Sequence, residues 1–202
     1  GTLYKNTVVS PDNITSTTYT DKSGNVVMQK VQNQGLSILN TLYAYDKYGL
    51  LRYVITPSAS ESLLQGTTLT PSSAMTLQQC YHYQYDGNGN MIYKQQPGRD
   101  AQLYVYDKGG REVMYQDGNM RSDGYWLCTQ YDEADRITLR GIVQSSLSAV
   151  QLRQRNSFLY SDFTPIKILE ENRYYGMTTG SNFTVPSFET NAISGTNDLS
   201  IT

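Results

Sequence analysis

The stretch YQYDGNG at residues 83–89 decides the fold, because it joins the end of a strand to a tight turn. Aspartate is favoured at the first position of a type I turn, where its carboxylate accepts hydrogen bonds from backbone N–H groups ahead of it. Glycine three residues later supplies the positive φ with which the chain re-enters the sheet. The tyrosines before the aspartate alternate with other residues, which places both rings on one face of a strand. The stretch therefore predicts a β-hairpin.

The same phrase recurs along the chain as YTDKSG at 19–24, YAYDKYG at 43–49, YVYDKGG at 104–110 and, degraded, TQYDEAD at 129–135. β-Branched, aromatic and apolar residues follow each copy, as expected for a return strand. An internal repeat of this kind predicts a stack of hairpins. The predicted structural turn residues are Asp21, Gly24, Asp46, Gly49, Asp86, Gly89, Asp107, Gly110 and Asp132.

The last copy departs from the pattern at its turn. Asp135 stands where the other copies have glycine, and Thr129 replaces the first tyrosine. Residues with a side chain resist positive φ. We therefore expect this last hairpin to be distorted.

Short helices are predicted at two places between the strands. Within an insertion at 56–79, Thr56-Pro57 and Thr70-Pro71 each place a capping hydroxyl before a proline, a usual helix start. A further helix is predicted over 147–155, opened by Ser146.

The expected fold class is all-β. Antiparallel β-hairpin repeats are expected to form a curved or rolled open sheet over residues 1–175, with one or two short helices. The polar stretch 176–202 is expected to form an edge strand or loop. Because an open sheet ends in unpaired strands, we also expect edge-to-edge self-association or a helix that covers the ends.

The composition excludes several classes of function. Sixteen Lys and Arg residues against 18 Asp and Glu give a net charge of −2, which argues against a nucleic-acid partner. No apolar run approaches the ~20 residues that a membrane-spanning helix needs. No signal peptide is visible, and the start at Gly1 without methionine is expected for an excised fragment.

Cysteine and histidine are too few for a common zinc site. Cys80 and Cys128 lie far apart in the sequence, there is no CxxC motif, and His82 is the single histidine. We therefore expect no metal and no cofactor. A disulfide between the two cysteines and two free thiols are both compatible with the sequence.

The repeated aspartates suit turn capping better than catalysis or calcium binding. Glycosidases need two carboxyl groups across a cleft, and calcium loops concentrate several oxygen ligands within about a dozen residues. Each of these aspartates stands alone at an equivalent turn position. We expect no catalytic residues, and hence no enzyme activity.

The aromatic residues allow two readings. Eighteen tyrosines and Trp126 could form ladders and core packing within the sheet, or an exposed platform that stacks on sugar rings. Trp126 and its neighbour Tyr125 are the candidate ligand-stacking pair. Rings buried between strands would favour a scaffold, and a row of exposed rings would favour carbohydrate binding.

These phrases resemble the YD repeats of Rhs, insecticidal Tc-toxin and teneurin proteins. The resemblance covers roughly residues 15–145. Residues 81–143 resemble in particular the Rhs-repeat proteins of Bacteroides-type bacteria, through YQYDGNGNMI at 83–92, Pro97-Gly98, YVYDK at 104–108 and Tyr131-Asp132.

The resemblance implies a shell-like or stalk-like scaffold. In this family a long ribbon of hairpins winds into a β-sheet spiral or shell. The implied function is a non-enzymatic scaffold in a secreted or cell-surface Rhs/YD-repeat protein. The implied partners are neighbouring YD repeats of the parent chain and, in some members, an encapsulated C-terminal effector. Surface glycans would be the partner of the alternative, a carbohydrate-binding module.

Overall fold

The computed structural model describes residues 2–33, 36–66, 68 and 70–174. A compact unit over residues 1–172 contains all of the strands. The predicted tail at 176–202 lies outside the described residues.

Twelve antiparallel strands form one sheet in which each strand is hydrogen-bonded to the strand before and the strand after it in the sequence. The sheet is open, because β1 and β12 are its two edges and do not pair with each other. This confirms the predicted fold class. The strands are β1 (Tyr4–Val9), β2 (Thr15–Thr20), β3 (Val26–Gln32), β4 (Leu39–Tyr45), β5 (Leu51–Ile55), β6 (Cys80–Tyr85), β7 (Met91–Gln95), β8 (Gln102–Tyr106), β9 (Glu112–Gln116), β10 (Tyr125–Tyr131), β11 (Ile137–Gln144) and β12 (Thr164–Glu171).

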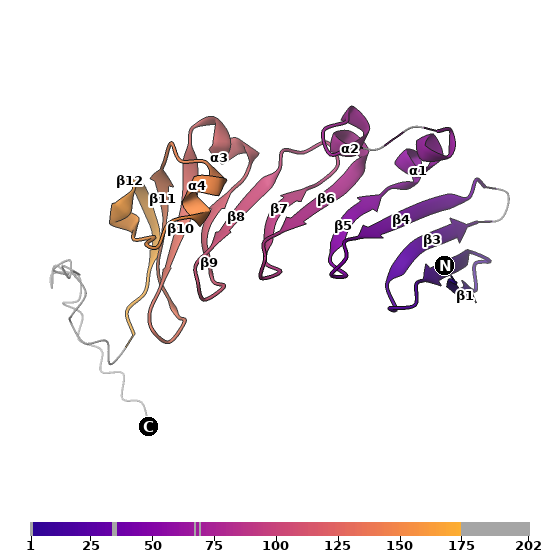
Figure 1. The fold of residues 1–202 in the computed structure, drawn as a ribbon, viewed down its shortest axis with the longest axis horizontal. Helices are drawn as coiled ribbons and strands as arrows, with labels where there is room; N and C mark the ends of the chain where they lie inside the picture. Colours follow the sequence, from indigo (N-terminus) through magenta and orange to yellow (C-terminus); the bar gives the residue numbers. More distant parts are fainter. Residues whose placement is uncertain (1, 34–35, 67, 69, 175–202) are drawn as a thin grey trace, which may run out of the picture. The chain divides into compact units, whose positions relative to one another are not determined.

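The repeated turns all lie at the same end of the strands (Figure 1). Each joins an even-numbered strand to the next odd-numbered one, from β2–β3 to β10–β11. The remaining connections lie at the opposite end and carry the short helices. These are α1 (Pro57–Leu64), α2 (Ala74–Gln79), α3 (Gly118–Ser122), α4 (Ala149–Arg153) and the 3₁₀ helix η1 (Tyr160–Asp162).

The described residues thus contain more short helices than the one or two expected. Helix α1 begins at Pro57 after Thr56, as predicted, although the Thr56 hydroxyl donates to the Gln79 carbonyl (2.7 Å) instead of capping the helix. Helix α2 does not begin at Thr70-Pro71. Its N-cap is Ser73, whose hydroxyl oxygen accepts a hydrogen bond from the Thr76 N–H.

The predicted helix near residue 147 is shorter than expected. Helix α4 is capped by Ser148, not by Ser146, and the Ser148 and Gln151 side chains form a capping box. The start of this helix is therefore fixed two residues later than the sequence pattern suggested.

The main hydrophobic core lies in the C-terminal part of the sheet. Side chains from β8 to β11 pack beneath the connection between β11 and β12, which contributes Leu152 of α4. The buried members are Val105, Val113, Met114, Trp126, Cys128, Val143 and Leu152. A second, smaller cluster forms where α1 covers β5 and β6, and its buried members are Ile55, Ala59 and Cys80.

Candidate functional site

The five repeated turns share one hydrogen-bond pattern, and we take this row of turns as the candidate functional site. In each, one carboxylate oxygen of the aspartate accepts hydrogen bonds from the backbone N–H groups two and four residues later, at 2.8–3.0 Å. The aspartate carbonyl accepts from the N–H three residues later, at 3.0–3.2 Å. The strand register shifts by one residue beside every turn, which is the signature of a β-bulge. The aspartates therefore act as turn-forming acceptors in the structure.

The second carboxylate oxygen is bound by the side chain four residues later in four of the turns. Asn25 and Asn90 donate one hydrogen bond each, at 3.1 and 3.0 Å. Arg111 and Arg136 donate through Nε and pair through a second nitrogen, at 2.7–2.8 Å. The recurrence of Asn or Arg at this position is a sequence signal that the turn motif alone does not contain.

These donors keep the turn carboxylates ionised. For Asp21, the backbone and side-chain hydrogen bonds from Asn25 lower the pKa of the carboxyl group. For Asp107, burial acts to raise the pKa, but the hydrogen bonds and charge of Arg111 outweigh it and the net pKa lies below the usual value. A carboxylate held in this way is a poor proton acceptor for catalysis.

The hairpin at residues 129–135 is not distorted, so the expectation for Asp135 was wrong. Asp135 adopts φ +61°, and its N–H donates to the Asp132 carbonyl at 3.1 Å as glycine does in the other copies. The register shift between Gln130 and Tyr131 also matches the other hairpins. Aspartate is one of the few residues that adopt the left-handed conformation readily, which explains why the turn survives.

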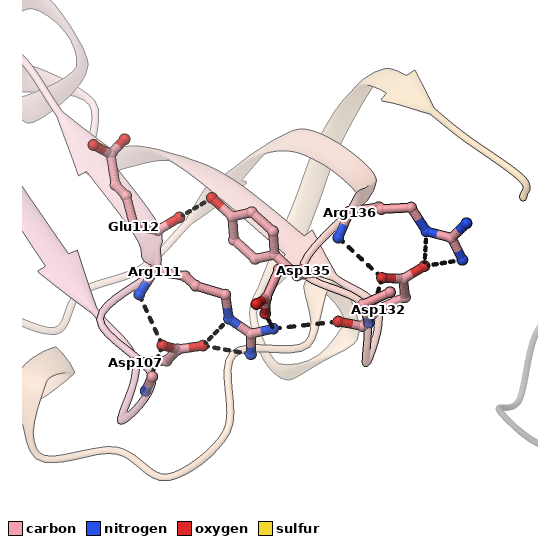
Figure 2. Close-up of polar contacts among 9 residues, drawn as sticks. Asp107, Arg111, Glu112, Asp132, Asp135 and Arg136 are labelled. Atoms are coloured by element: carbon pink, nitrogen blue, oxygen red, sulfur yellow. Dashed lines mark hydrogen bonds and ion pairs between the residues drawn. The ribbon is translucent and has the colours of Figure 1, made fainter.

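Arg111 connects two neighbouring turns (Figure 2). Its guanidinium pairs with Asp107 in its own turn, and Nη1 donates to the Asp132 carbonyl (3.2 Å) and to Asp135 Oδ1 (2.8 Å) in the next turn. It also lies over the Tyr131 ring, with 5.1 Å between the guanidinium carbon and the ring centroid. One side chain therefore fills the gap between the two turns.

In three copies, the second tyrosine of the motif forms a hydrogen bond to the preceding hairpin. The hydroxyl groups of Tyr45, Tyr106 and Tyr131 donate to the carbonyls of Val26, Met91 and Glu112, at 2.8–3.0 Å. Each acceptor is the second residue after the turn glycine of the hairpin before. These rings serve the sheet by linking neighbouring repeats.

Arg153 also holds separate strands together, a role that the sequence did not reveal. Its guanidinium donates from α4 to the carbonyls of Ile92 in β7 and Tyr104 in β8, at 3.0 and 3.2 Å. Burial lowers the pKa of this guanidinium. Nothing in the scattered arrangement of basic residues pointed to this contact, because it joins residues 61 positions apart.

The candidate ligand-stacking pair does not form an exposed platform. Trp126 is 2% exposed and belongs to the main core, so its ring faces are covered by protein. Tyr125 is half-buried. The hypothesis that Trp126 stacks on a sugar ring is therefore not supported.

His82 and the two cysteines are buried within the sheet. His82 is 2% exposed and stacks on Tyr53 at 4.5 Å between ring centroids, and burial lowers its pKa. Cys80 and Cys128 are free thiols, and burial raises the pKa of Cys128 to about 12. A thiol with so high a pKa is a weak nucleophile at neutral pH.

A groove opens between the first two turns of the row. It has a volume of about 690 Å³ and is lined by residues of the β2–β3 and β4–β5 hairpins, including Asp21, Asn25, Tyr45, Asp46 and Tyr48. Among the described residues, no group of three or more His, Cys, Asp and Glu side chains is placed to hold a metal ion. No helix within the described ranges is long and apolar enough to span a membrane.

The structure defines a class of protein: an open antiparallel sheet of hairpin repeats whose repeated residues form turns and link hairpins. Comparison with known proteins agrees with this class. The crystal structure of TcdB2–TccC3–Cdc42 is similar, with a TM-score of 0.50 and 17% sequence identity; the match covers 67% of this chain and 6% of that chain. The Tc holotoxin pore of Photorhabdus luminescens matches with a TM-score of 0.49 and 16% identity, over 70% of this chain and 6% of that chain.

No family model and no curated protein matches the chain. At 17% identity the likeness to TcdB2–TccC3 shows a shared fold alone, and it spans a small part of that protein's length. The shared fold is that of a Tc-toxin chain, which is one of the groups that the YD phrases resemble.

Proposed function

We propose that the chain is a non-enzymatic structural segment of a longer Rhs/YD-repeat scaffold. The observation that carries this proposal is that the repeated polar and aromatic residues bond to other groups of the sheet itself. The turn carboxylates, the second tyrosines Tyr45, Tyr106 and Tyr131, and Arg111 make bonds within or between hairpins. Their hydrogen bonds and ion pairs stabilise the turns and join the hairpins of the sheet.

The two edges of the sheet support neighbouring repeats as partners. All residues of β1 and β12 are exposed, and among the described strands each pairs on one side alone. Both edges carry apolar side chains, such as Val8 and Val9 at 60% exposure and Leu169 at 52%. Exposed strand edges of this kind pair readily with further strands.

The family resemblance extends the proposal in two ways. The assignment to the Bacteroides type rests on the sequence motifs at 81–143. A secreted or cell-surface location rests on the resemblance of the YD phrases to Rhs and Tc-toxin proteins.

Amide hydrogen exchange of β1 and β12 tests the scaffold proposal. Exchange is measured in this chain and in the longest product of its gene. Further repeats that pair with the edges would slow exchange in β1 or β12 of the longer protein, while the central strand β8 serves as the internal reference. Equal exchange at both edges in the two proteins would overturn the proposal.

A further inference from the structure

The gap between neighbouring turns is filled in one part of the sheet and open in another. Between the Asp107 and Asp132 turns, the guanidinium of Arg111 occupies the gap. Between the Asp21 and Asp46 turns, the residue equivalent to Arg111 is Asn25, and the gap is the groove of about 690 Å³. The two gaps are built from equivalent positions of the same repeat.

Asn25 is too short to do what Arg111 does. Its side-chain nitrogen donates to Asp21 Oδ2 at 3.1 Å, within its own turn. Arg111 makes the equivalent bond and then continues to the carbonyl of Asp132 and the ring of Tyr131 in the next hairpin. The gap between the Asp21 and Asp46 turns therefore has no guanidinium that bonds to both turns.

Most of the groups that bind the Arg111 guanidinium have equivalents in the open groove. The Asp21 carboxylate corresponds to Asp107, the Asp46 carbonyl to that of Asp132, and the Tyr45 ring to Tyr131. The hydrogen bonds from Asn25 lower the pKa of Asp21, so this carboxylate is charged at neutral pH.

Two features of the groove differ from the filled gap. Gly49 replaces Asp135, so one carboxylate is missing, and nothing lies within 4 Å of where a Cβ at Gly49 would stand. The groove also contains Lys47, whose amine lies 4.8 Å from the centroid of the Tyr48 ring. In the gap that follows Asn90, by contrast, the Asn90 side chain reaches to 3.9 Å from the Cβ position at Gly110 in the next turn.

We propose that the groove between the Asp21 and Asp46 turns binds the guanidinium group of an arginine side chain from a partner polypeptide. The bound group takes the place that Arg111 takes between the Asp107 and Asp132 turns. A guanidinium suits this place because its planar donors can bond a carboxylate and a carbonyl together while its face stacks on a tyrosine ring. The site does not require the chain to be a shell segment, so it stands apart from the scaffold proposal.

The direct test is an NMR titration of the whole chain with Nα-acetyl-arginine amide. The backbone amides of residues 23–25 and 46–49 are expected to shift in a saturable way. Nα-acetyl-citrulline amide has nearly the same shape without the charge, and it is expected to leave these amides unmoved. Equal shifts with both compounds, or no saturable shift with either, would overturn the proposal.

Two variants locate the site. Asn25→Arg places a covalently attached guanidinium in the groove and is expected to abolish binding of the probe. Asp21→Asn retains an oxygen acceptor for the turn N–H groups but removes the charge, so binding is expected to weaken by roughly tenfold or more. Unchanged binding in a folded Asn25→Arg variant would contradict the proposal. If the Asn25→Arg variant does not fold, the Asp21→Asn variant decides: unchanged binding of the probe there would contradict the proposal.

The reciprocal variant tests whether the two gaps are equivalent. Arg111→Asn copies residue 25 into the filled gap, where the new asparagine can bond Asp107 as Asn25 bonds Asp21. The probe is then expected to shift the amides of residues 109–111 and 132–135 in addition to those of the first groove. If the variant is folded and these amides do not respond, the acceptors shared by the two gaps do not suffice to bind a guanidinium, and the proposal fails.

Discussion

The N-terminal half of the sheet, β1–β5, and the C-terminal half, β8–β11, have the same turns but differ in how many side chains they bury. Strands β8–β11 enclose the main core around Trp126 and Met114. Arg111 joins their two hairpins, and Arg153 joins β8 to β7. Among the described residues before Ile55, Thr17 is the single buried one. The turns of the first half nevertheless keep the same hydrogen bonds and the same register shift. The repeat thus specifies each hairpin and, through its second tyrosine, a hydrogen bond to the hairpin before, whereas a buried core depends on residues outside the repeat.

The largest effect is expected for Trp126→Ala. Removing this buried ring leaves a cavity and should lower the free energy of unfolding by about 3–5 kcal/mol. Denaturant unfolding followed with amide hydrogen exchange measures the loss, which should appear first in β8–β11.

Tyr4→Ala is the matched control in the other half, since Tyr4 is 61% exposed in β1. Its effect should stay within about 0.5 kcal/mol. Similar losses in the free energy of unfolding for Trp126→Ala and Tyr4→Ala would show that the two halves do not differ in stability as their burial suggests.

The next effect concerns the turns, which both halves share. Gly89 has φ +85° and nothing within 4 Å of an added Cβ, so Gly89→Val should cost about 1 kcal/mol or more through backbone strain alone. Gly87→Val, in the same turn with equally open space but no positive φ, should cost less. Thermal melting of the two variants separates strain from the loss of a glycine.

Gly24→Val sharpens the comparison between the halves. Gly24 has the same φ of +85° as Gly89, but its hairpin lies in the half without a large core. Hydrogen exchange should rise in β2 and β3 of this variant while β8–β11 stay protected. A uniform rise along the whole sheet would argue that the halves unfold as one.

Acid should weaken the middle of the sheet before the Trp126 core. Burial lowers the pKa of His82, and the charge of Arg52 lowers it further. Because the unfolded chain then binds the proton more readily, stability is lost as the pH falls below the unfolded value of about 6.5. Melting temperature against pH should show this loss in the natural protein and lack it in His82→Gln.

The smallest effect is expected for Asp135→Gly. Glycine would relieve the positive φ of +61°, but the ion pair with Arg111 at 2.8 Å would be lost. Asp135 is 77% exposed, so the pair contributes little and the two changes should nearly cancel, within about 0.5 kcal/mol. A loss well above this by denaturant unfolding would show that the bridge between turns matters more than its exposure suggests.

The hairpins could be predicted because each is specified by neighbouring residues. Aspartate, the residue four positions later and the positive-φ position between them form one local unit, which is why even Asp135 fits. The expectation of a distorted turn failed because it weighed the missing glycine without the left-handed preference of aspartate. The start of α2 was missed because Thr76 donates to the Thr70 carbonyl (2.6 Å), so a turn precedes the helix.

The arginine contacts between hairpins and the packing of the 145–163 connection could not be predicted from the sequence. Arg111 meets Asp135 across 24 positions, and the connection at 145–163 folds back over Trp126. Such contacts depend on the spacing between strands and on where a connection runs. The sequence therefore left two readings of Trp126 open, and the burial of its ring decides between them.

All repeated turns lie at one end of the strands, so the two borders formed by the strand ends differ in how far the length of their connections can vary. Along one border every crossing is the same four-residue turn, held by the same aspartate, so an insertion there would break the pattern that makes the hairpin. Along the other, the crossings range from a tight turn at 10–14 to the two-helix segment at 56–79. New segments can be added at that border without disturbing a strand. Related chains should therefore keep one border constant in length and carry their differences along the other.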